Sequence, residues 1–392
     1  MVGKYILQFI CYEPRIYSAF DVFCVSLANE LSRNGKVAVF VYYGSLEFVP
    51  ELEKDLINAG AIIKFMPNHG FIHKFGAIYK LYKKLNPIMS HAHFEKDIKL
   101  YSAICAKLQR VPHFIHFRSQ IYDDSIDYRK SKGVVKFWIL RSYLYILFLL
   151  STKIFFVSDY VKKQFCYFVD KMTRSNNLIT LYNGITIKHY EENKSLIRMR
   201  LGLPQNKVII SNISAIEYIK GIDLIIKAIK KVKKEYNINN VLFCHIGGIR
   251  VQSQKLKEYH QSLLELVEEL GLKDDVIFMG RRFDILEVLP AFDIYVQPSR
   301  MEGLGNATIE AASRKLPLIG SDAGGIPETI KHNESGYVFN SENVDELATY
   351  LYKLITDDSL RKIIGNKAYD TAREKFNVEN QISELINFYN LN

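Results

Sequence analysis

Short apolar segments alternate with amphipathic segments along most of this chain, and the alternation starts twice. In the first half, residues 36–43 and 61–66 have the composition of strands, and residues 45–59 between them have a helical pattern. Strands that alternate with helices predict βαβ units and parallel sheets. The second half repeats this pattern, with strands expected at 208–213, 241–246, 276–279, 294–297 and 316–320, and helices at 221–236, 254–270 and 307–314.

A length of 392 residues suits two α/β domains, at roughly 100–200 residues per domain. The polar segment 188–200, followed by Gly202 and Pro204, indicates the boundary between them. We therefore expect an N-terminal acceptor-binding Rossmann-like domain over 1–187 and a C-terminal donor-binding one over 188–370. Residues 344–364 also have a helical pattern, and a helix within 371–392 is expected to pack back toward the first domain. Two such sheets facing each other would place a cleft at the carboxyl ends of their strands, where ligands bind.

The cysteine pattern indicates a reducing compartment. The five cysteines are scattered and form no C-x-x-C pair, which favours free thiols over disulfides. The apolar run at the N-terminus stops at Cys11, too short for a secretory signal, and is expected to form a buried strand. The expected location is the cytoplasm.

Positive charge is concentrated in the first half of the chain. Residues 1–190 hold 26 Lys and Arg against 14 Asp and Glu, a net charge of +12, whereas the remainder carries −2. Besides solubility, such a charge favours an anionic partner, for example a lipid headgroup or a phosphorylated acceptor. No nucleic-acid-binding motif accompanies it.

The segment Val134–Leu150 is strongly apolar but contains Lys136 and Arg141. The uncharged stretch after Arg141 is shorter than the roughly 20 residues that a spanning helix needs. A helix buried in the core and a helix lying in the membrane interface both remain open. The second alternative would place the protein peripherally on the inner face of the cell membrane.

Residues 297–330 carry the most informative motif. A strand ends at 297–299, and the glycine-rich turn 302–305 follows, with Asn306 expected to cap a helix that begins at Ala307. Glycines allow close backbone approach to a ligand, and a helix N-terminus favours phosphate. Glu302 and Glu310 would accept hydrogen bonds from sugar and ribose hydroxyls. A tight turn without a ligand remains the structural alternative.

These residues resemble the retaining glycosyltransferases of group 1, which have the GT-B fold. Glu302 and Glu310 match the E-x7-E motif of that family, within a P-S, E-G-x-G and E-A context. The segment 324–328 matches its G-G-x-P-E stretch, and Lys220-Gly221 its K-G pair. Weaker matches lie at 181–185, 246–248 and 276–280.

The resemblance implies roles for individual residues. Glu302 would contact the donor sugar, Glu310 the ribose, and Lys220 the diphosphate, while His116 would reach the donor sugar from the other half. An alternative for His116 is a structural histidine at a strand end. The remaining implied donor-binding residues are Gly247, Gly303, Leu304, Gly305 and Asn306, the last three through backbone N–H groups.

The implied activity is retaining hexosyl transfer from a nucleotide-diphosphate sugar, without metal or cofactor. The acceptor is expected to be a lipid-linked or surface-polysaccharide precursor, in polysaccharide biosynthesis. Alternatives on the same fold are a sugar-nucleotide epimerase, a phosphorylase and a non-catalytic partner subunit.

The chain departs from the family at two places. Ser214-Ala215 stands where an arginine is usual, and Arg250, Arg281 and Arg282 are candidate substitutes. The loop 14–19 lacks the usual glycines, and its Arg15 is a candidate contact for an anionic acceptor.

No metal site is expected. His91 and His93 lie on one side of a strand, as zinc ligands would, but no third ligand is evident from the sequence. Asp123, Asp124 and Asp127 suit a solvated loop better than a cation site.

Overall fold

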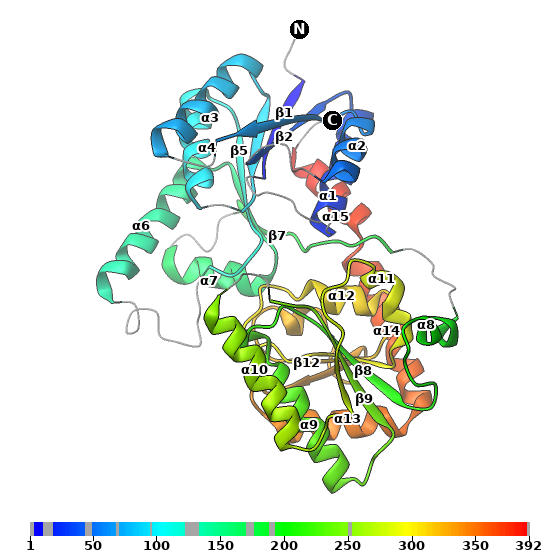
Figure 1. Cartoon of the computed structure of the whole chain (residues 1–392). Coiled ribbons are helices and arrows are strands. Elements are labelled where there is room, and N and C mark those ends of the chain that lie inside the picture. Colours follow the sequence, from blue (N-terminus) through cyan, green and yellow to red (C-terminus); the bar gives the residue numbers. More distant parts are fainter. Residues whose placement is uncertain are drawn as a thin grey trace. The chain divides into compact units, whose positions relative to one another are not determined.

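The computed structural model describes residues 4–10, 19–43, 49–67, 70–94, 96–121, 133–169, 176–187, 193–249 and 253–389. The chain divides into two compact units. The first unit comprises Met1–Thr186 together with Asn377–Asn392, and the second comprises Ile187–Phe376. Each unit is an α/β structure built on a parallel sheet, as the alternating pattern predicts (Figure 1).

The sheet of the first unit has seven parallel strands in the order β3-β2-β1-β4-β5-β6-β7. Its strands are β1 (Tyr5–Phe9), β2 (Val37–Tyr43), β3 (Ile62–Met66), β4 (Met89–Ala92), β5 (His113–Phe117), β6 (Lys153–Phe156) and β7 (Leu178–Thr180). The central strands are almost continuously buried, which is usual where helices cover both faces of a parallel sheet.

Helices cover both faces of this sheet (Figure 1). One face packs against α1 (Ala19–Arg33), α2 (Pro50–Asn58) and α15 (Val378–Tyr389). The other packs against α3 (Phe71–Leu85) and α4 (Lys96–Leu108). Two further helices, α6 (Val134–Leu150) and α7 (Asp159–Val169), precede β6 and β7.

The sheet of the second unit has six parallel strands in the order β10-β9-β8-β11-β12-β13. Its strands are β8 (Val208–Ile213), β9 (Val241–Ile246), β10 (Val276–Phe278), β11 (Ile294–Gln297), β12 (Leu318–Ser321) and β13 (Gly336–Phe339). Its helical segments are α8 (Lys194–Arg200), η2 (Tyr218–Lys220), α9 (Ile222–Glu235), α10 (Gln254–Glu269), α11 (Ile285–Val288), η3 (Leu289–Ala291), α12 (Asn306–Ala312), η4 (Ile326–Glu328), α13 (Val344–Thr356) and α14 (Asp358–Lys375).

Each sheet has one point at which the strand order reverses. In the first sheet this point lies between β1 and β4, and in the second between β8 and β11. The loops that leave neighbouring strands there run to opposite faces of the sheet, so a crevice opens at their carboxyl ends. Lys220 follows β8, and Glu302 lies in the loop after β11.

The end of the chain differs from the expected helices. The pattern over 344–364 predicts one helix, but α13 ends at Thr356 and α14 begins at Asp358. The break occurs because the Asp357 carboxylate caps α14 by accepting a hydrogen bond from the Leu360 N–H at 2.8 Å.

The C-terminal boundary of the second unit also differs from the expected domain boundary between residues 370 and 371. Helix α14 continues to Lys375, so residues 371–376 belong to the second unit. The following helix, α15, belongs to the first unit, where the hydroxyl of its Tyr389 bonds the side chains of Gln8 and His91.

Helix α6 is neither a fully buried helix nor a membrane-spanning one. Phe137, Leu140, Leu144 and Leu147 are buried on one face. The opposite face is apolar but exposed, and its most exposed side chains are Val135, at 72%, and Ile139, at 63%. Within the described parts of the chain, no helix is both long and apolar enough to cross a membrane.

Candidate active site

Lys220 and Glu302 form an ion pair at the switch point of the second sheet. Lys220 ends the short helix η2 after β8, and Glu302 lies in the turn after β11. The Nζ atom of Lys220 lies 2.8 Å from Oε2 of Glu302, and both side chains are 21% exposed. The structure thus brings together two predicted site residues that are accessible from solvent.

Glycines hold the backbone segments of this site in close contact. A Cβ atom on Gly221 would lie 2.1 Å from the carbonyl oxygen of Pro298, so the start of α9 presses directly on the loop after β11. A Cβ atom on Gly324 would lie 1.9 Å from the carbonyl oxygen of Glu302. The Gly325 N–H donates to that same oxygen at 3.1 Å. The glycines of the G-G-x-P-E motif therefore support the Glu302 turn.

The helix after this turn starts one residue earlier than predicted. Asn306 is the first residue of α12 and therefore does not occupy the cap position. Gly305 occupies the cap position with a φ of 93°, a backbone conformation that favours glycine. The side chain of Leu304 is buried, so only its backbone is available to a ligand. Gly303 lies against Gly325, since a Cβ atom added to Gly325 would lie 2.3 Å from the Gly303 carbonyl oxygen.

Glu310 lies on α12, the helix that follows the Glu302 turn. Burial raises the pKa of its carboxyl to about 7, and Arg314 opposes this shift. The carboxylates of Glu310 and Glu302 both act on the buried Tyr295 of β11, where burial and these charges raise the pKa of the phenol. The charges of both motif glutamates are therefore felt at Tyr295.

Gly247 lies at the end of β9, against the loop that follows β8. Its φ is 148°, and a Cβ atom there would lie 1.8 Å from the carbonyl oxygen of Ser214. Its N–H donates to the carbonyl oxygen of Gly280 at 2.9 Å. Gly247 thus fixes the approach of three loops at the carboxyl end of the sheet.

The candidate substitutes for the missing arginine have different surroundings. Arg282 is bound to the carboxylate of Asp284 at 2.9 and 2.6 Å. Arg281 is exposed and lies beside Gly248: a Cβ atom added to Gly248 would lie 3.9 Å from the Cβ atom of Arg281. Of these two residues, Arg281 is the one placed beside the glycine turn. Arg250 and Arg15 lie outside the described residues.

His116 belongs to the first unit, where it lies in β5 and is fully buried. Neither ring nitrogen has a hydrogen-bond partner of normal geometry among the described residues. Burial lowers its pKa well below the usual value, as do the charge of Arg118 and the neighbouring His91, although the Leu181 backbone opposes this shift. The imidazole is therefore neutral near pH 7 and can donate one hydrogen bond and accept another.

The structure corrects the expectation that His91 and His93 have no third partner. One ring nitrogen from each of His91, His93 and His116 lies within 4.8 Å of the others. All three rings are buried, and their pKa values are lowered by burial and by the charge of Arg118. Three neutral imidazoles are a ligand set that zinc accepts.

Two observations make these histidines a poor cation site. Both ring nitrogens of His93 are engaged, one with Gln8 at 3.0 Å and the other with the Nε–H of Arg118 at 3.1 Å. A dication would also sit near the positive charge of Arg118, which repels it. The candidate carboxylates Asp123, Asp124 and Asp127 lie outside the described part of the chain.

Sequence reasoning missed the ion pair between Asp223 and Arg300. Arg300 donates to both carboxylate oxygens of Asp223, at 2.8 and 3.0 Å, and its side chain is only 12% exposed. Asp223 lies in the first turn of α9, two residues after Gly221. An arginine two residues before Glu302 is visible in the sequence, but its partner 77 residues away is not.

Comparison with known proteins identifies the class of this protein. Residues 193–371 match the family described as glycosyl transferases group 1. An uncharacterized glycosyltransferase of Methanocaldococcus jannaschii is 26% identical over 403 residues, which cover 97% of this chain and 96% of that protein. A UDP-Gal:α-D-GlcNAc-diphosphoundecaprenol α-1,3-galactosyltransferase of Escherichia coli is 24% identical over 80% of this chain and 78% of its own.

The fold is shared with the HepE protein of Anabaena, solved in complex with UDP. The TM-score is 0.79 at 17% identity, and the match covers 98% of this chain and 99% of HepE. HepE has also been solved with UDP-glucose. Residues 193–371 thus form a domain of the glycosyl transferases group 1 family. The chain is a glycosyltransferase with two Rossmann-like domains, the GT-B fold.

Proposed function

We propose that this glycosyltransferase transfers a hexose from a UDP-linked donor, with retention of anomeric configuration and without a metal ion. The observation that carries the proposal is the Lys220–Glu302 pair, set among glycine turns at the switch point of the second sheet. The UDP and UDP-glucose complexes of HepE, which shares the fold, support uridine diphosphate as the carrier.

In this proposal each residue has a defined role. Glu302 binds hydroxyls of the donor sugar, and Glu310 accepts hydrogen bonds from the ribose. Lys220 and the backbone N–H groups of residues 304–306 stabilise the diphosphate as it gains charge. Gly247 and Gly303 allow the donor to approach the backbone.

The reaction breaks the bond between the anomeric carbon and the diphosphate oxygen, and the electron pair leaves with the diphosphate. The acceptor hydroxyl attacks from the same face, forms the new glycosidic bond, and gives its proton to the departing diphosphate. The protein contributes positioning and electrostatic stabilisation, and no cofactor is needed. Arg281 beside Gly248 is placed to add a second positive charge.

Two measurements test this proposal. A thermal-shift screen with UDP, GDP, ADP and their sugars identifies the carrier, because a ligand of the folded state raises the melting temperature. We expect the uridine compounds to give the largest shift. Nuclear magnetic resonance of the first product then gives the anomeric configuration. An inverted product, or equal shifts for all nucleotides, would overturn the proposal.

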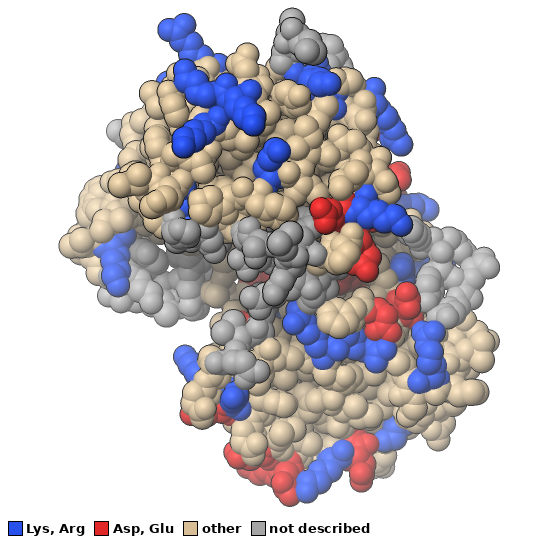
Figure 2. All heavy atoms as spheres, turned by 45° about the horizontal axis from the view of Figure 1, so that its top comes forward, with Lys and Arg blue, Asp and Glu red and all other residues tan. Residues whose placement is uncertain are grey.

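We further propose that the acceptor is a lipid-linked or surface-polysaccharide precursor, reached at the inner face of the cell membrane in a cytoplasmic protein. The diphosphoundecaprenol acceptor named for the E. coli relative supports a lipid-linked substrate. The net charge of +12 over residues 1–190 supports contact with anionic lipid. Lys and Arg outnumber Asp and Glu on the face of the first unit that Figure 2 shows.

Helix α6 supplies the apolar part of this proposed membrane contact. Its exposed face includes Trp138, Ile139 and Tyr145, with Lys136 and Arg141 on the same helix. The guanidinium of Arg141 lies 5.3 Å from the centre of a Trp138 ring. Aromatic and basic side chains around an apolar face suit a helix that lies in the membrane interface.

A further inference from the structure

Arg300 joins three segments at the candidate active site. Its guanidinium binds the carboxylate of Asp223 through two hydrogen bonds, at 2.8 and 3.0 Å. It also donates to the carbonyl oxygen of Tyr218 at 2.7 Å and to the carboxylate of Glu342. Asp223 belongs to the start of α9, Tyr218 to η2, and Glu342 to the segment between β13 and α13.

The contacts of Arg300 converge on the segment that carries Lys220. The guanidinium carbon lies 4.0 Å from the centre of the Tyr218 ring, and the Arg300 backbone N–H donates to the carbonyl oxygen of Ile219 at 2.8 Å. Arg300 thus contacts both residues that precede Lys220. It contacts Asp223 on the other side, so the η2–α9 junction is held at both ends.

Arg300 is also only two residues from Glu302 along the chain. The backbone between them is fixed on one side by Ser299, whose carbonyl oxygen accepts a hydrogen bond from Ser321 at 2.6 Å. On the other side, Gly325 donates to Glu302. A displacement of Arg300 therefore alters the position of Lys220 relative to Glu302, although within the described part of the chain Arg300 forms no hydrogen bond with either side chain.

We propose that Arg300 is a positioning residue that sets Lys220 and Glu302 at the spacing the donor requires. Arginine suits this role because its planar fork binds Asp223 with two bonds and still reaches a backbone carbonyl. Lysine has no such fork. The inference rests on the proposed function, since it takes Lys220 as the residue that binds the diphosphate.

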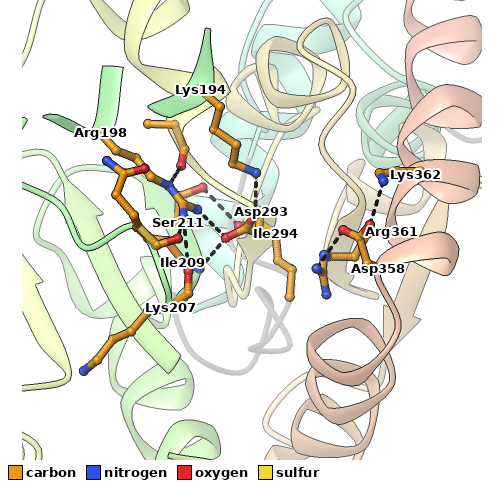
Figure 3. A network of polar contacts seen from close by, with 12 residues as sticks. Lys194, Arg198, Lys207, Ile209, Ser211, Asp293, Ile294, Asp358, Arg361 and Lys362 are labelled. Atoms are coloured by element: carbon orange, nitrogen blue, oxygen red, sulfur yellow. Dashed lines mark hydrogen bonds and ion pairs between the residues drawn. The ribbon is translucent and has the colours of Figure 1, made fainter. Parts of the chain in front are cut away.

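Arg198 provides a matched control in the same unit. Its side chain is 6% exposed, bonds Asp293 at 2.6 Å, and donates to the carbonyl oxygen of Ala291 at 2.8 Å (Figure 3). Asp293 precedes β11 and also accepts from the N–H of Ile209, near the start of β8. Arg198 is thus even less exposed than Arg300 and is also paired, but it lies at the amino ends of the strands, opposite the site.

The test compares UDP-glucose affinity in Arg300→Met, Arg300→Lys, Arg198→Met and wild-type protein, by titration calorimetry well below each melting temperature. We expect Arg300→Met to weaken binding about tenfold or more, Arg300→Lys to restore little of it, and Arg198→Met to change affinity less than about twofold. Glu342→Gln, which removes charge from an exposed partner, is expected to have a small effect.

A double-mutant cycle with Lys220→Met separates positioning from general destabilisation. If Arg300 acts through Lys220, the effect of Arg300→Met on affinity should largely disappear in the Lys220→Met background. A full effect of Arg300→Met in that background would overturn the inference. So would an unchanged affinity of a folded Arg300→Met protein, or an equal loss in Arg198→Met.

A wrong role for Arg300 can be distinguished from a wrong proposed function. If wild-type protein binds no uridine nucleotide, the proposed donor is wrong and the cycle is repeated with the nucleotide found by the thermal-shift screen. If wild-type protein binds UDP-glucose but the cycle shows no coupling, only the role of Arg300 is wrong. The melting temperatures of all variants, measured alongside, report whether each one is folded.

Discussion

Lys220 Nζ lies 2.8 Å from Glu302 Oε2, although 82 residues separate them in the chain. The pair joins the loops after β8 and β11 at the switch point of the second sheet. A diphosphate bound there would share Lys220 with the Glu302 carboxylate.

Removing either Lys220 or Glu310 should weaken donor binding while leaving the fold intact. Each substitution to Ala deletes one charge-assisted contact, which costs on the order of 1.5–3 kcal/mol. Titration calorimetry with UDP-glucose at pH 8 measures the loss, and circular dichroism checks the fold. Unchanged affinity in both folded variants would exclude the proposed roles.

Donor binding should strengthen as the pH rises through about 7. Burial raises the pKa of Glu310 to about 7, so its carboxyl is mainly protonated at pH 6 and mainly ionised at pH 8. Ribose hydroxyls donate more strongly to the ionised form. UDP-glucose is the better probe than UDP, because its diphosphate has no group that titrates near neutrality. The Glu310→Gln variant should lose this pH dependence.

Ionisation of the Glu310 carboxyl should lower the stability of the free protein, although it strengthens donor binding. A carboxyl with a raised pKa in the folded state favours folding when protonated, so its contribution is complete below the unfolded pKa, near 4.3. That contribution is lost as the pH rises toward about 7. Chemical denaturation at pH 5 and 8 should show a smaller loss of stability with pH in Glu310→Gln than in wild-type protein.

Substituting Gly324 should displace the Glu302 turn. Ala at Gly324 would place its Cβ atom 1.9 Å from the Glu302 carbonyl oxygen. Gly271 is a matched control: its φ of +66° resembles the +63° of Gly324, but no heavy atom lies within 4 Å of its Cβ position. Both variants carry the cost of placing an L-residue in a left-handed backbone conformation, about 1–2 kcal/mol. Only Gly324→Ala should also weaken UDP-glucose binding, and equal affinities would contradict the packing argument.

Transfer activity should not require a divalent metal ion. Lys220 supplies positive charge at the proposed diphosphate site, and the cluster of His91, His93 and His116 is a poor cation site beside Arg118. Activity after EDTA treatment and desalting checks this expectation. Loss of activity that zinc restores would direct attention to the three histidines. Restoration by magnesium would direct it to Asp123, Asp124 and Asp127.

Liposome binding should depend on the exposed face of α6. The protein is expected to sediment with phosphatidylglycerol vesicles, to bind neutral vesicles weakly, and to be released by high salt. Ile139→Glu should reduce binding, because it places a charge on the 63% exposed apolar face. Ile363→Glu is the matched control, with a similar exposure of 60% on α14 of the other unit. Equal sedimentation of both variants would contradict a role of α6.

The sequence by itself determined the fold class and most of the strands of the second unit. Apolar alternation is a local property, and β8, β9 and β11 have the bounds that this pattern predicts. The motif residues from Glu302 to Glu310 are also close in sequence, so their place in one turn and one short helix could be predicted. Asp357 divided the expected helix over 344–364, because its backbone is extended and its carboxylate caps the start of α14.

Only the tertiary structure decided which distant side chains meet. Asp223 pairs with Arg300, and His116 with His91 and His93, because strand order places neighbouring strand ends side by side. Packing also decided that α6 has one buried and one exposed apolar face, since its composition is apolar all round. Likewise, the raised pKa of Glu310 comes from burial, which depends on neighbours that periodicity and spacing do not specify.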